Sequence, residues 1–71
     1  MLNKRSLTLS GHPTSLALEP EFWAALQAMA ENEAVSLAIL IGRIDKARQG
    51  RSLASACRTE ALAWALGRPP S

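Results

Sequence analysis

TSLALEPEFWAALQAMAENEAVSLAILIGRI, at residues 14–44, is the stretch that decides the fold. It opens with the alternation of a short strand, because Leu16 and Leu18 face one way while Ser15 and Ala17 face the other. A single strand cannot satisfy its own backbone hydrogen bonds, so this one needs a partner. Two partners are open: the same strand in a second copy of the chain, and the upstream run at residues 4–10.

The rest of this stretch predicts two helices. Pro20 suits the first helical position and favours an extended Glu19 at the N-cap, which predicts a helix over residues 20–33. Ser36 is a good N-cap for a second helix over residues 36–49, in which Ile39 lies opposite the main apolar stripe. Because this second helix has apolar residues on two sides, we expect other parts of the protein to pack against both of them. The first helix presents one apolar face, made of Phe22, Trp23, Leu26, Met29 and Ala30.

Residues outside this stretch add a strand and a third helix. Leu7 and Leu9 alternate with polar residues over residues 4–10, which predicts a strand or an arm that orders on contact. The Gly-His-Pro sequence at residues 11–13 predicts a break, with His12 as a turn residue. Downstream, Ser52 can cap a third helix over residues 52–66. We expect residues 1–66 to form a single domain and residues 67–71 to be a flexible tail.

Composition excludes several classes of protein. With 71 residues the chain has room for one small core, and such scaffolds need a disulfide, a metal or oligomerisation. Cys57 is the only cysteine and His12 the only histidine, which argues against disulfides and Cys/His metal sites and leaves oligomerisation. Cys57 and Trp64 are interpreted as core residues of the third helix or as a subunit contact.

No catalytic motif or phosphate-binding glycine loop occurs in the sequence, so we expect neither an enzyme nor a cofactor or metal. No signal peptide and no apolar run long enough to cross a bilayer is evident. We therefore expect a cytoplasmic protein that does not contact membranes. Charge is uneven, since residues 1–18 contain Lys4 and Arg5 but no acid, and an anionic partner is expected to meet this end.

Two segments carry a family resemblance: KRSLTLSGHPTSLALEPEFWAAL at residues 4–26 and SLAILIGRID at residues 36–45. A third helix follows these segments after a glycine-containing turn. Together they resemble the ribbon–helix–helix family of the Arc/MetJ/CopG type, and most closely a bacterial branch of it. The resemblance implies a mainly α fold with a short β-ribbon, an intertwined homodimer and an additional C-terminal helix. In that arrangement Leu16, Leu18, Leu26, Ile41 and Ile44 would build a core shared by two chains.

The family resemblance also implies that the ribbon enters the DNA major groove and that the start of the second helix binds a phosphate. Residues 14–18 offer only short outward side chains, so DNA contact is expected mainly from residues 4–10. Whether residues 4–10 or 14–18 form the intersubunit ribbon stays open. The expected DNA-binding residues are Lys4, Arg5, Ser6, Thr8, Ser15 and Ser36.

The leading hypothesis is a DNA-binding transcriptional regulator that acts as a homodimer or higher oligomer. The alternative is a protein-interaction or assembly module on the same fold, with little sequence-specific DNA binding. In this alternative the third helix holds a protein partner or a further copy through Leu62 and Leu66.

Overall fold

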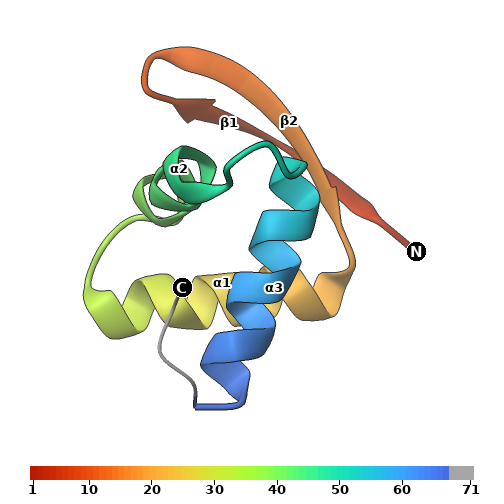
Figure 1. The fold of residues 1–71 in the computed structure, drawn as a ribbon, viewed down its shortest axis with the longest axis vertical. Helices are drawn as coiled ribbons and strands as arrows, with labels where there is room; N and C mark the ends of the chain where they lie inside the picture. Colours follow the sequence, from red (N-terminus) through yellow and green to blue (C-terminus); the bar gives the residue numbers. More distant parts are fainter. Residues whose placement is uncertain (68–71) are drawn as a thin grey trace.

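The computed structural model describes residues 1–67, which form a two-stranded ribbon followed by three helices. Figure 1 shows the ribbon lying across α2 and the start of α3, with α1 on the far side of these helices. This confirms the expected mainly helical fold with a third helix. Residues 68–71 of the predicted flexible tail lie outside the described residues. The elements in order are β1 (Asn3–Leu9), β2 (His12–Leu18), α1 (Pro20–Glu33), α2 (Leu37–Ala47) and α3 (Leu53–Ala65).

The ribbon is an antiparallel hairpin made by one chain, so β1 is the strand that pairs with β2. Its two-residue turn consists of Ser10 and Gly11, whose φ angles of 51° and 80° are those of the turn that matches strand twist. The predicted break at residues 11–13 therefore holds for Gly11, which is in the turn, but is wrong for the two residues after it. His12 and Pro13 belong to β2 rather than to the turn. Proline is tolerated there because β2 has an unpaired edge and can place the missing N–H on it.

Local sequence signals set the start of each helix. Pro20 occupies the first turn of α1, and Glu19 before it is extended, with ψ at 148°. The hydroxyl oxygens of Ser36 and Ser52 each accept a hydrogen bond from a backbone N–H three residues later, at 3.1 Å. No helix within residues 1–67 is by itself long and apolar enough to cross a membrane. The pair α1 and α2 reaches that length and apolarity only together, across a bend of 103°.

The core lies between the inner face of the hairpin and the three helices. All five residues expected to build a shared core are buried within one chain, so their burial does not require a second chain. Sharing of that core between two chains stays a prediction. Ile39 is 54% exposed and Trp64 42% exposed, so within the chain α2 is not packed on both sides and Trp64 is not a core residue. The buried residues are Leu9, Leu16, Leu18, Trp23, Leu26, Met29, Ala30, Leu40, Ile41, Ile44, Ala56, Cys57 and Ala61.

Candidate nucleic-acid interface

The outward face of the hairpin brings four of the six expected contact residues together. In the pairing register, Ser6 lies directly opposite Ser15, and Lys4 and Thr8 flank Ser6 on β1. Successive side chains of a strand point to opposite faces, so these four point away from the core, which is built from Leu9, Leu16 and Leu18. All four are exposed. They span about 13 Å along β1, at roughly 3.3 Å per residue.

The chemistry of this face is polar and weakly basic. Hydroxyl groups at its centre can both donate and accept hydrogen bonds. The Lys4 ammonium group at one end offers a point charge that suits a phosphate. No aspartate or glutamate occurs in residues 1–18, so nothing on the hairpin itself repels a polyanion.

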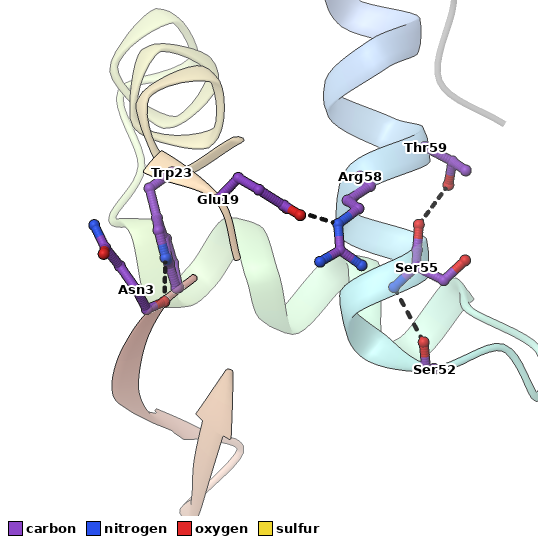
Figure 2. Close-up of polar contacts among 7 residues, drawn as sticks. All are labelled: Asn3, Glu19, Trp23, Ser52, Ser55, Arg58 and Thr59. Atoms are coloured by element: carbon purple, nitrogen blue, oxygen red, sulfur yellow. Dashed lines mark hydrogen bonds and ion pairs between the residues drawn. The ribbon is translucent and has the colours of Figure 1, made fainter. Parts of the chain in front are cut away.

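Arg5 does not belong to this face. It shares the inner side of β1 with Leu7 and Leu9, and its guanidinium lies 4.6 Å from the centre of the Trp23 ring. The indole nitrogen of Trp23 in turn donates a 2.8 Å hydrogen bond to the backbone oxygen of Asn3, as Figure 2 shows. These two contacts attach the start of β1 to the first turn of α1. Arg5 is therefore placed to hold the hairpin rather than to reach the same ligand as Lys4.

A second anchor lies where β2 passes into α1. The Nε atom of Arg58 in α3 donates to the carboxylate of Glu19 at 2.9 Å (Figure 2), and its guanidinium lies 5.9 Å from the centre of the Phe22 ring. This hydrogen bond from Arg58 lowers the pKa of the Glu19 carboxyl below its usual value. The pair is partly exposed, so its contribution to stability is small. Its role is to join α3 to the exit of the hairpin.

The structure adds two basic residues that the sequence-based prediction missed. Arg43 and Lys46 of α2 line a hollow of about 250 Å³ with Thr8 and Ser10 at the turn end of β1. Arg43 is ion-paired with Glu33, whereas Lys46 takes part in none of the ion pairs formed within residues 1–67. The sequence could have shown that Arg43 and Lys46 lie on the same face of the second helix, because residues three apart share one face. Lys46 thus extends the basic character of the hairpin onto α2.

Ser36 lies at the start of α2, outside the hairpin face. Its hydroxyl accepts the N–H of Ile39, which leaves the N–H groups of Leu37 and Ala38 without a partner inside the helix. Ala38 also lines the hollow that contains Thr8, so the start of α2 lies on the same side of the molecule as the turn end of β1. Such N–H groups can bind an anion.

Other reactive groups do not form a site. Burial raises the pKa of the Cys57 thiol to about 11, so the thiolate form is disfavoured and the sulfur is inert. Within residues 1–67 no group of three or more His, Cys, Asp and Glu side chains could hold a metal ion. A groove of about 480 Å³ between α2 and α3 has mixed charge, because Arg48, Arg51 and Glu60 line it.

Comparison with known families agrees with this arrangement. The model of the ribbon-helix-helix domain matches residues 2–65, which is nearly the whole chain, and members of this family generally are DNA-binding transcription regulators that dimerise. The chain belongs to the ribbon-helix-helix family. No curated protein and no solved structure shows significant similarity to the chain.

Proposed function

We propose that this protein is a cytoplasmic transcriptional regulator that binds DNA as a homodimer through the outward face of its hairpin. The observation that carries the proposal is the gathering of Lys4, Ser6, Thr8 and Ser15 on one exposed, acid-free face. A two-stranded ribbon has the width that the major groove admits. Membership of the ribbon-helix-helix family supports the same reading.

The contact residues divide into two roles. Lys4 and Lys46 supply attraction to phosphates, which does not depend on base sequence and weakens with salt. The N–H groups after Ser36 offer a further phosphate contact. The hydroxyls of Ser6, Thr8 and Ser15 are the groups available for hydrogen bonds to base edges. Arg5 acts at a distance from the DNA by holding β1 on Trp23. No residue is assigned a catalytic role.

The test is DNA binding measured by fluorescence anisotropy between 50 and 200 mM salt. We expect binding that weakens as salt rises, and Lys4→Ala should reduce the slope of log affinity against log salt by about one for each Lys4 that meets a phosphate. Arg51→Ala is the matched control, because it removes an exposed cation that is not part of the hairpin. The proposal fails if no binding occurs at low salt, or if the two variants change the slope equally.

A second candidate function is an assembly module that uses the end of α3. Leu62, Trp64 and Leu66 are 55%, 42% and 57% exposed, so the last two turns of this helix carry uncovered apolar surface. In this reading, light scattering on the purified protein shows particles larger than a dimer. The double variant Leu62→Lys/Leu66→Lys then reverts to smaller particles, and DNA binding is absent from both proteins. Salt-sensitive DNA binding by a simple dimer rejects this function.

A further inference from the structure

We propose that β2 recognises thymine in the major groove, through contacts between the C5-methyl group of the base and the hydrocarbon side chains of Pro13 and Ala17. This recognition rests on the proposed function, because it names the DNA feature that the outward face of the ribbon contacts. Three features of β2 support it: the direction of these two side chains, the residue types that the strand lacks, and the shortness of its outward side chains.

The first feature is the direction in which Pro13 and Ala17 point. They alternate along β2 with Leu16 and Leu18, which are buried in the core, so they lie on the opposite side of the strand together with Ser15. Pro13 and Ser15 are exposed, and Ala17 is partly exposed. All three therefore lie on the face at which the proposed function places the DNA.

The second feature is the absence from β2 of the side chains that distinguish the other bases. Arginine or lysine reads guanine, asparagine or glutamine reads adenine, and an acidic side chain reads cytosine, in each case through hydrogen bonds to the base edge. Residues 12–18 contain none of these residue types. Apolar side chains contact instead the C5-methyl group of thymine, which no other base carries in the groove. Thymine is thus the base whose edge matches Pro13 and Ala17 in chemistry.

The third feature is that the outward side chains of β2 are short. The methyl group of Ala17 extends the strand by one carbon, so it reaches a base only if the backbone of β2 lies close to the floor of the groove. No long side chain on this side of β2 prevents that approach. Directly opposite Ala17 on β1 is Lys4, whose longer side chain can reach a phosphate at the same time. Thr8, opposite Pro13, adds a further methyl group.

Removal of the thymine methyl groups from the DNA tests this recognition without any change to the protein. The probes are a short duplex of alternating A·T pairs and the same duplex with every thymine replaced by uracil, which keeps all charges and hydrogen-bonding groups. Burial of one methyl group changes affinity by about fourfold. We therefore expect the wild type to bind the thymine duplex at least about fourfold more tightly than the uracil duplex in fluorescence anisotropy.

A variant assigns this preference to the protein side chain. Ala17→Gly removes one methyl group and keeps the backbone N–H, so it should lower the ratio of thymine to uracil affinity by about fourfold. The ratio is measured on one protein, so an unfolded fraction lowers both affinities equally and cancels. Ala65→Gly is the matched control, because Ala65 is exposed at the end of α3, which lies away from the ribbon (Figure 1). It should leave the ratio at the wild-type value.

The outcomes separate this inference from the proposed function. Equal binding of the two duplexes by the wild type overturns the inference and leaves the proposed function standing. Binding of neither duplex at low salt overturns both. A preference for thymine that Ala17→Gly leaves unchanged also overturns the inference, because the preference would then arise from the shape of the DNA rather than from a methyl contact.

Discussion

Trp23→Phe tests whether the start of β1 is held by α1. Trp23 is 2% exposed, and the change removes the 2.8 Å hydrogen bond to the Asn3 oxygen and part of the ring beneath Arg5. The lost hydrogen bond is worth about 1 kcal/mol. The smaller ring costs about 1 kcal/mol more in buried apolar area. We therefore expect a total loss of about 2 kcal/mol in the free energy of unfolding.

A loss of this size is easy to measure in so small a domain. Typical stabilities of about 0.05–0.15 kcal/mol per residue give this chain of 71 residues about 4–11 kcal/mol in all. The melting temperature should fall by about 8–16 °C, and the urea midpoint should fall with it. Circular dichroism follows both transitions. Hydrogen exchange should also show faster exchange of the amides of residues 3–5, because β1 loses its attachment.

The matched control for this prediction is Trp64→Phe. Trp64 is 42% exposed, and its indole N–H forms none of the side-chain hydrogen bonds found within residues 1–67, so its replacement should change stability by less than about 0.5 kcal/mol. Equal effects of the two substitutions would show that α1 does not hold β1, because the attachment would then contribute nothing beyond the bulk of an indole ring.

Three further predictions concern the remaining parts of the fold. Gly11→Ala should cost about 1 kcal/mol of stability in urea unfolding, because its φ is +80°, and an unchanged midpoint would contradict the turn geometry. Cys57 should resist a thiol reagent at pH 8 and react only at the rate of unfolding, because burial raises its pKa to about 11; rapid labelling of the folded protein would count against that burial. Glu19→Gln should lower the stability only slightly at pH 7, since both Glu19 and its partner Arg58 are partly exposed. The pKa of Glu19 is lowered in the fold, so the difference between Glu19→Gln and wild type should shrink as pH falls through this lowered pKa, and a difference that stays constant as the pH is made acidic would exclude the ion pair as its cause.

Local signals in the sequence were sufficient to predict the helices. Pro20, Ser36 and Ser52 each act on the backbone within three residues of their own position, so their effect does not depend on the rest of the fold. The turn was harder to predict. Pro13 was interpreted as a break because proline removes a donor, but on an edge strand that donor would have pointed away from the partner strand. Only the register of the two strands decides between these readings.

The sequence could place some residues of the candidate interface but not those that meet only through tertiary packing. The alternation of Leu7 and Leu9 already placed Arg5 on their side of β1, and this signal was available in the sequence. Nothing in the sequence showed that Lys46 and Thr8 line the same hollow, because their proximity depends on how α2 packs against the hairpin. The burial of the core by one chain was likewise not predictable. It depends on α3, whose docking onto α1 and α2 is a tertiary event.

In the proposed function, DNA lies on the outward face of the hairpin. Backbone amide NMR during titration with a short duplex tests it most directly, because each amide reports its own position. We expect little change in the amide shifts from Ala56 to Ala65 in α3. The largest changes should fall on Lys4, Ser6, Thr8, Ser15 and Lys46. Changes concentrated on α3, with the hairpin amides unmoved, would contradict it.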